Sequence, residues 1–154
     1  MKNFTINIPV TELSYDELTP DELQLVDTAR RATHRAYAPY SHFHVGAAIR
    51  LDNGIIVPGS NQENAAFPSG TCAERSACYY AGARYPEAHF QAIAIAARGA
   101  DGQELDTPAS PCGACRQALV EYEQLAGHDV PVYLAARHKI YRLPSVASLL
   151  PLTF

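Results

Sequence analysis

Three of the four cysteines lie in two short motifs whose spacing suits a metal site. One motif is C-A-E, which begins at Cys72, and the other is P-C-G-A-C, which contains Cys112 and Cys115. Two cysteines spaced C-x-x-C at the start of a helix can bind one metal ion, and Cys72 can supply a third sulfur. Three protein ligands leave one tetrahedral position open, which is typical of catalytic zinc sites rather than structural ones.

The cysteine count alone allows other interpretations. An even number permits two disulfides, and a single C-x-x-C also occurs in thioredoxin-like redox proteins. The redox interpretation leaves Cys72 and Glu74 without a role. Cys78 stands six residues after Cys72, about 9 Å along a helix axis. We therefore expect Cys78 to pack in the core and not to bind the same ion.

Glu74 has a candidate catalytic role and a simpler structural one. In zinc deaminases, one ligand and a non-ligand glutamate precede a P-C-x-x-C motif, and the glutamate acts as general acid and base. This sequence has the same order, with Cys72 in the place of a histidine. The alternative is a capping box, in which Thr71 caps a helix and Glu74 bonds back to the cap. The two interpretations compete for the same carboxylate.

Both cysteine motifs fall where helices are expected to begin. Thr71 can cap the first helix, and Ser110 can cap the second, with Pro111 in its first turn. The positive end of a helix dipole and its free N–H groups stabilise thiolates. Arg75, and also Arg116, can donate a hydrogen bond to a ligand sulfur. We therefore expect the two helix starts to meet around one metal ion.

The remaining sequence indicates strands that alternate with helices. Thr19, Pro20 and Glu22 form a helix start, and apolar residues at helical spacing extend that helix to about Ala36. The D-N-G sequence at 52–54 predicts a tight hairpin turn. The predicted strands are residues 4–8, 43–51, 55–59, 91–96, 130–135 and 139–143, and further helices are expected over 72–83, 111–126 (ending before Gly127) and 145–150. This alternation predicts an α/β sandwich with a mixed sheet.

Length and composition restrict the possible classes of protein. The chain has 154 residues, of which 47% are hydrophobic, which suits a single domain over 1–154 with residues 1–18 as an N-terminal extension. The net charge of −4 disfavours a protein that binds nucleic acid through its phosphates. No apolar run has the length of a membrane span or of a secretory signal. We therefore expect a cytoplasmic protein with no membrane partner.

Five short motifs follow one another in a specific order. They are Y-S-x-F-x-V-G-A-A from Tyr40, N-x-E-N from Asn61, C-A-E-R from Cys72, P-C-G-A-C-R-Q from Pro111 and L-L-P-x-x-F ending at Phe154. In this order and spacing, the chain resembles the small cytidine deaminases of the three-cysteine, homotetrameric type. The resemblance covers nearly all of residues 20–154, and the set of motifs is far more specific than any one of them.

The resemblance implies both a fold and a set of site residues. The fold is a cytidine deaminase-like α/β three-layer sandwich, with a five-stranded mixed sheet and helices on both faces. Cys72, Cys112 and Cys115 would bind Zn²⁺, and Glu74 would move protons. On the substrate side, the resemblance implies Phe43 as a wall of the pocket, Asn61 and Glu63 as ribose ligands, Ala73 as a backbone contact to the base, and Phe154 as a contact between subunits of a homotetramer with shared active sites.

The resemblance also implies the reaction. Zinc-dependent hydrolysis would convert cytidine and 2′-deoxycytidine to uridine and 2′-deoxyuridine with release of ammonia, as in pyrimidine salvage. The carboxylate of Glu63 and the net charge of −4 favour a small-molecule nucleoside over a nucleotide. One alternative is a deaminase of another aminopyrimidine nucleoside, such as blasticidin S. A second is a non-catalytic zinc-binding domain, which would not need Glu74 or an open coordination position.

Overall fold

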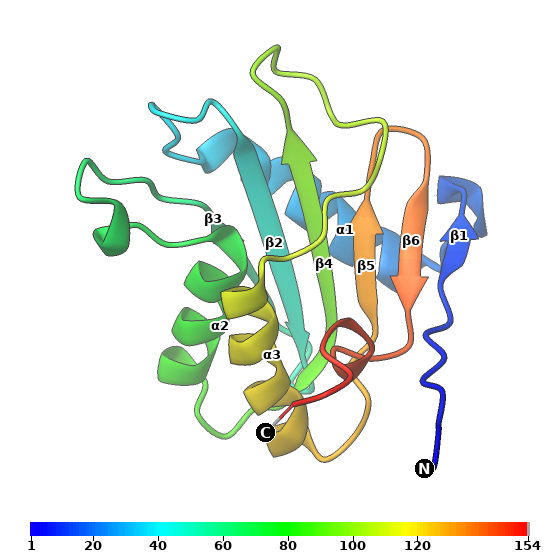
Figure 1. Cartoon of the computed structure of the whole chain (residues 1–154). Helices are drawn as coiled ribbons and strands as arrows, with labels where there is room; N and C mark the ends of the chain where they lie inside the picture. The colour runs from blue at the N-terminus through cyan, green and yellow to red at the C-terminus, as the bar shows by residue number, and fades with distance from the viewer. Residues whose placement is uncertain (154) are drawn as a thin grey trace.

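A six-stranded mixed sheet forms the central layer of the protein in the computed structural model, which describes residues 1–153 (Figure 1). The strands lie in the order β1-β6-β5-β4-β2-β3, with β4 and β5 parallel. Helix α1 (Pro20–Ala32) covers one face, and α2 (Ala73–Arg84) and α3 (Gly113–Ala126) cover the other. The strand bounds are Thr11–Leu13 (β1), His44–Leu51 (β2), Ile56–Ser60 (β3), Phe90–Arg98 (β4), Val132–Ala135 (β5) and Ile140–Leu143 (β6). The predicted three-layer α/β sandwich is confirmed, with six strands instead of five.

The sixth strand comes from the N-terminal extension. The strand predicted over residues 4–8 is wrong, because the sheet pairing begins only at Thr11, which lies opposite Arg142 of β6. Pro9 has no N–H to donate to a neighbouring strand, which disfavours pairing before this point. The hydroxyl of Tyr15 donates to the carbonyl oxygen of Ala136 at 2.6 Å and fixes the chain just after β1. Residues 1–18 therefore extend the sheet beyond β6.

The central strand β4 separates two apolar layers. Its alanines Ala94 and Ala96 pack with α1, while Ile93 and Ile95 belong to the cluster beneath α2 and α3. Small side chains on the α1 side let that helix approach the sheet closely. Gly46 of β2 shows how close, since a Cβ there would stand 2.1 Å from a backbone oxygen of α1. The alternation of large and small residues along β4 thus fixes the spacing of the three layers.

Helix ends follow the local sequence at some positions and not at others. Thr19 caps α1 as predicted, and the Glu22 carboxylate accepts from the Thr19 N–H at 2.8 Å. The helix ends at Ala32, four residues before the predicted end, and continues as a 3₁₀ turn. Gly127 ends α3 as expected, with a positive φ of 71°. The 3₁₀ turns are Tyr15–Glu17, Thr33–Arg35, Phe67–Ser69 and Ala147–Leu149, the last in place of the helix predicted over 145–150.

The strand directions bring three loops to one end of the sheet. Strands β3 and β4 both run antiparallel to β2, so their carboxyl ends lie where β2 begins. The loop after β3 leads into α2, and the loop after β4 leads into α3. Phe43 directly precedes β2 at the same end. Both cysteine motifs and the segment before β2 therefore lie at the same end of the sheet (Figure 1).

Within residues 1–153, no helix combines the length and apolar character needed to cross a membrane.

Candidate metal centre

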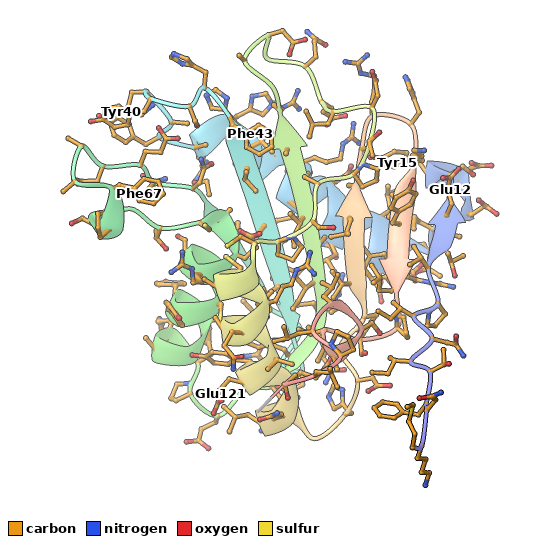
Figure 2. All side chains as sticks on the ribbon, in the orientation of Figure 1. Glu12, Tyr15, Tyr40, Phe43, Phe67 and Glu121 are labelled. Carbon is orange, nitrogen blue, oxygen red and sulfur yellow. The ribbon has the colours of Figure 1, made fainter. Side chains whose placement is uncertain are left out.

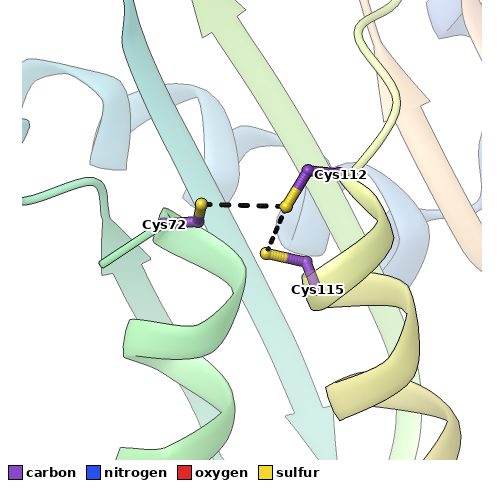
Figure 3. A group of neighbouring side chains, drawn as sticks. All are labelled: Cys72, Cys112 and Cys115. Atoms are coloured by element: carbon purple, nitrogen blue, oxygen red, sulfur yellow. Dashed lines mark hydrogen bonds between the residues drawn. The ribbon is translucent and has the colours of Figure 1, made fainter. Parts of the chain in front are cut away.

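The three predicted ligand sulfurs lie together between the starts of α2 and α3 (Figure 3). The Sγ atoms of Cys72 and Cys112 are 3.9 Å apart, those of Cys112 and Cys115 are 3.4 Å apart, and all three lie within 4.8 Å of one another. Tetrahedral zinc with Zn–S bonds of about 2.3 Å needs sulfurs about 3.8 Å apart. The cluster therefore fits a zinc ion with three thiolate ligands and one further position for water or substrate.

The helix starts differ in detail from the prediction, in a way that favours metal binding. Cys72 and Cys112 are themselves the N-cap residues, where Thr71 and Ser110 were expected. Their backbone is extended, and each cap carbonyl accepts the first helical N–H bond at 3.0 Å, from Ser76 and Arg116. The side chains at the caps thus lie beside the unpaired N–H groups and positive dipole ends, which favour thiolates.

The observed helix boundary excludes one of the two interpretations of Glu74, the capping box. Because α2 begins at Ala73, Glu74 is its second residue, and no capping box with Thr71 forms. The Glu74 side chain is buried, and the residue is only 5% exposed. Burial raises the pKa of Glu74, and the negative charge of Cys72 adds to this effect. Glu74 is therefore a buried carboxylate near the sulfurs with a raised affinity for protons.

The surroundings of Cys72 and Cys115 shift the pKa values of these two thiols in opposite directions. The neighbouring Cys115 thiol does most to lower the pKa of Cys72, Arg75 and Cys112 lower it further, and together these effects outweigh partial burial. The neighbouring Cys72 sulfur does most to raise the pKa of Cys115, and burial adds to this effect. Arg75 Nη2 donates to Cys72 Sγ at 3.5 Å, as predicted for a residue that draws charge from a ligand.

Arg116 does not have the role suggested for it. Its Nε donates to the carbonyl oxygen of Pro111 and its Nη1 to that of Leu149, both at 2.8 Å. Arg116 therefore connects the start of α3 to the C-terminal segment by hydrogen bonds and does not donate to a sulfur. Cys78 is fully buried in the core, as predicted, and burial raises the pKa of its thiol to about 12. A thiol of this kind stays protonated and is a poor ligand.

Asn61 fastens the segment that carries Phe43. Its Oδ1 accepts from the Val45 N–H at 2.7 Å, and its Nδ2 donates to the Phe43 carbonyl oxygen at 2.9 Å. Among the described residues, 1–153, one N–H and one lone pair of the amide have no partner, and these are enough for one hydroxyl group. Sequence reasoning predicted a ribose ligand at Asn61 and missed this anchoring of Phe43, which depends on the alignment of β2 with β3.

Glu63 holds the turn before Phe43 in a similar way. Its Oε2 accepts from the backbone N–H groups of Tyr40 at 2.9 Å and Ser41 at 3.2 Å, and its Oε1 accepts from the Ser41 hydroxyl. The hydroxyl bond does most to lower the pKa of Glu63 below its ordinary value. An ionised carboxylate has about four acceptor positions, of which the described part of the chain fills three, so one remains for a further donor.

The other predicted substrate contacts are Phe43, Ala73 and Phe154. Phe43 is exposed, and Figure 2 shows it at the same end of the molecule as Tyr40 and Phe67. Ala73 is fully buried at the start of α2. Gly59 of β3 permits this, since a Cβ there would stand 2.5 Å from the Ala73 carbonyl oxygen. A glycine inside a predicted strand was the available signal for this close approach. The predicted contact of Phe154 lies outside the described residues.

Known proteins are similar to this chain in sequence and in fold. The family model for the cytidine and deoxycytidylate deaminase zinc-binding region matches residues 20–126. The cytidine deaminase of Sporosarcina psychrophila is 38% identical over 137 residues, covering 87% of this chain and 91% of that protein. That of Halalkalibacterium halodurans is 37% identical over 134 residues, covering 87% and 94%.

Solved structures agree with the sequence comparison. The crystal structure of cytidine deaminase from Burkholderia pseudomallei has a TM-score of 0.71 at 36% identity, and covers 85% of this chain and 97% of that one. Cytidine deaminase from Mycobacterium tuberculosis gives 0.67 at 30% identity, with 85% and 94% covered. The clustered cysteines, the fold and these relatives lead to one conclusion: the chain belongs to the cytidine and deoxycytidylate deaminase zinc-binding family.

Proposed function

We propose that the protein is a zinc-dependent cytidine deaminase, which hydrolyses cytidine and 2′-deoxycytidine to uridine and 2′-deoxyuridine with release of ammonia, in pyrimidine salvage. The observation that carries this proposal is the convergence of three cysteine sulfurs at two helix starts, with the buried Glu74 two residues after the first of them. Relatives named cytidine deaminase that align over most of the chain support the same reaction. We further propose that residues 1–154 act as one catalytic domain, with residues 1–18 as an extension.

The donor set indicates which residues would hold the metal ion. Cys72, Cys112 and Cys115 would hold zinc, because three sulfurs at the observed spacing suit a soft tetrahedral ion with one open position. A bound zinc ion supplies Lewis acidity at that position, where it acidifies water. Arg75 would offset the negative charge of the three thiolates by its hydrogen bond to Cys72.

Glu74 would carry the protons of the hydrolysis. Its carboxylate takes a proton from the attacking water and delivers it to N3 of the cytosine ring. The water oxygen forms a bond to C4, and the bond from C4 to the amino group then breaks. Glu74 takes the remaining proton of the added oxygen and passes it to that amino group, which leaves as ammonia, so that C4 keeps the oxygen as a carbonyl and the carboxylate is regenerated. A raised pKa suits this exchange, because the group must both accept and release a proton near neutral pH.

The substrate side of the proposed pocket favours a nucleoside. Asn61 and Glu63 each retain hydrogen-bonding capacity for a sugar hydroxyl, Phe43 offers an apolar wall, and the Ala73 backbone would contact the base. The Glu63 carboxylate is ionised near neutral pH, and hydrogen bonds lower its pKa below the ordinary value. A 5′-phosphate nearby would be repelled, which disfavours deoxycytidylate and polynucleotides as substrates.

A substrate panel tests the proposal. Purified protein with zinc is incubated with cytidine, 2′-deoxycytidine, deoxycytidylate and blasticidin S, and ammonia release is measured. We expect turnover of the two nucleosides and little turnover of deoxycytidylate. Preference for blasticidin S would favour a deaminase of another aminopyrimidine nucleoside. Absence of ammonia from every substrate, in protein shown to bind zinc, would favour a non-catalytic zinc-binding domain.

We also propose that the enzyme works in the cytoplasm as a homotetramer with shared active sites. Free cysteines as ligands suit a reducing compartment. Phe154 is the residue proposed to reach a neighbouring subunit's site. Light scattering of the zinc-loaded protein at assay concentration checks this, and a monomer mass would contradict the tetramer.

A further inference from the structure

The segment that presents Phe43 is a short turn with an unusual backbone. The His42 N–H donates to the Ala38 carbonyl oxygen at 3.0 Å, which closes the turn just before Phe43. His42 has a φ of 54°, in the left-handed region that residues other than glycine seldom adopt. Such a turn keeps its shape only when the surrounding contacts determine it. The side chains that bind this turn are therefore expected to control where Phe43 lies.

Ser41 links this turn to the Glu63 carboxylate through hydrogen bonds. Its hydroxyl donates to Glu63 Oε1, and the same oxygen of Ser41 accepts from the Phe43 N–H at 3.1 Å. The other carboxylate oxygen, Oε2, accepts from the N–H groups of Tyr40 and Ser41. One serine hydroxyl thus connects a proposed ribose ligand directly to the backbone of the proposed pocket wall.

The two partners of Ser41, Glu63 and Phe43, are also held by hydrogen bonds from outside the turn. The Glu63 N–H donates to the Tyr37 carbonyl oxygen at 2.8 Å, and Gln62 and Thr71 exchange two backbone hydrogen bonds of 2.9 Å. Thr71 is the residue before Cys72, so this ladder runs from the turn to the cysteine cluster. On the far side of Phe43, the Asn61 amide holds the carbonyl oxygen independently of Ser41.

We propose that Ser41 is a positioning residue for the nucleoside pocket, acting through Glu63 and Phe43. The proposal rests on the deaminase function proposed above. Without the hydroxyl, Glu63 keeps its bonds to the two backbone N–H groups but loses the one that fixes Oε1, and the Phe43 N–H loses its acceptor. The carboxylate can then rotate and the aromatic wall can shift, while the cysteines and Glu74 stay in place. The loss falls on substrate binding and not on the chemical step.

The first test compares Ser41→Ala with Ser41→Thr in the zinc-loaded enzyme. We expect Ser41→Ala to raise KM for cytidine roughly five- to tenfold, the size of one ordinary hydrogen bond, with kcat, zinc content and Tm close to wild type. Ser41→Thr keeps the hydroxyl and should restore KM. Ser69→Ala, which removes an exposed hydroxyl from the neighbouring loop, is the matched control. An unchanged KM in Ser41→Ala, or a KM for Ser41→Thr as high as that for Ser41→Ala, would overturn the proposal.

A second test asks whether Ser41 acts through Glu63. Residues that act through one another give non-additive effects in a double-mutant cycle. Ser41→Ala should therefore raise KM by much less in a Glu63→Gln background than in the wild type. Equal effects in the two backgrounds would show that Ser41 acts by another route and would contradict the proposal.

A third measurement separates this proposal from the proposed function. Amide hydrogen exchange of the full chain reports the turn without requiring turnover. We expect Ser41→Ala to speed exchange in residues 38–44 and to leave α2 and α3 unchanged. If the wild type released no ammonia, the deaminase function would fail. Unchanged exchange in the turn would overturn the role of Ser41 whatever the activity.

Discussion

At the scale of single residues, Glu74 combines features that a surface glutamate lacks. It is buried, it lies two residues after Cys72, a proposed zinc ligand, and its pKa is raised mainly by burial. Sequence reasoning found the residue through its spacing to Cys72. The sequence leaves capping and catalysis as alternatives, because a capping box forms only if Thr71, and not the next residue Cys72, is the N-cap of α2.

Replacing Glu74 with glutamine tests its proton-carrying role. The amide has the same shape but accepts no proton, so we expect kcat for cytidine to fall about 100- to 10,000-fold, the usual contribution of a general acid and base. Zinc content should stay at the wild-type level, as measured by metal analysis of the same sample. Glu121→Gln on the exposed face of α3 is the matched control and should keep wild-type turnover (Figure 2). Near-normal activity of Glu74→Gln would disprove the assigned role.

The Asn61 side chain stabilises the fold by accepting one hydrogen bond through Oδ1 and donating another through Nδ2. In Asn61→Asp, the group facing the Phe43 carbonyl oxygen changes from a donor to an acceptor, so two oxygens oppose each other across the present 2.9 Å contact. We expect the free energy of unfolding to fall by about 1–3 kcal/mol, measured by urea denaturation. Asn53→Asp is the control, because there the side chain only accepts, from the Ile55 N–H, and an aspartate preserves that bond. Equal stability losses in the two variants would contradict this explanation.

At the scale of elements, local chemistry predicted where several helices begin or end. The capping box of α1 and the glycine after α3 are signals that require no distant partner. The strand β1 and the end of α1 at Ala32 have no such signal. β1 exists because β6 offers a free edge at the right register, and that pairing joins residues about 130 positions apart. The sequence pattern around Ile6 is a better strand by composition, yet it pairs with nothing in the described chain.

The two helix starts form a site only as a pair, which makes zinc part of the stability of the α2–α3 layer. We expect Cys112→Ala to lose most of its zinc, because two sulfurs remain where three were needed. With free zinc at about 1,000 times its dissociation constant, zinc stabilises the wild type by about 4 kcal/mol. A chelator should therefore lower the Tm of the wild type and hardly change that of Cys112→Ala.

Cys78→Ala provides the comparison for this experiment. It removes a thiol from the same layer, but from the core and not from the cluster. Its Tm should be lower than that of the wild type, while its zinc content and its response to the chelator should not change. Loss of zinc in Cys78→Ala, or full zinc content in Cys112→Ala, would refute the ligand assignment.

At the scale of the whole molecule, Glu104 connects the loop that precedes α3 to helix α1. Arg30 of α1 donates to both of its carboxylate oxygens, at 2.8 and 3.0 Å, and Arg98 donates at 3.3 Å. Partial burial acts to raise the pKa of Glu104, but the bonds and charges of these arginines outweigh it and lower the pKa. The ion pair thus links the layer on one face of the sheet to the loop that carries the cysteine pair.

This linkage predicts a pH-dependent contribution to stability. Because the pKa is lower in the folded state, the stabilisation is complete above the unfolded pKa of about 4.3 and is lost as pH falls through the folded value. Glu104→Gln should therefore lower the free energy of unfolding at pH 7 by about 1.5–3 kcal/mol. The difference between wild type and variant, from urea denaturation between pH 7 and pH 3, should shrink below pH 4.3. A difference that stays constant to pH 3 would rule out the ion pair as its cause.

Residues 1–18 add a strand, β1, to one edge of the sheet, where it pairs with β6. This strand lies before the residues matched by the family model. Three cross-strand pairs join β1 to β6. At about 0.2–1 kcal/mol for each pair, removing residues 1–13 should cost about 0.6–3 kcal/mol and lower Tm by up to several degrees. The exposed edge should also raise aggregation with concentration, measured by light scattering.

Removing residues 1–7 alone keeps β1 intact and is expected to leave both properties unchanged. Equal effects of the two deletions would mean that the extension stabilises the protein by contacts other than the β1–β6 pairing.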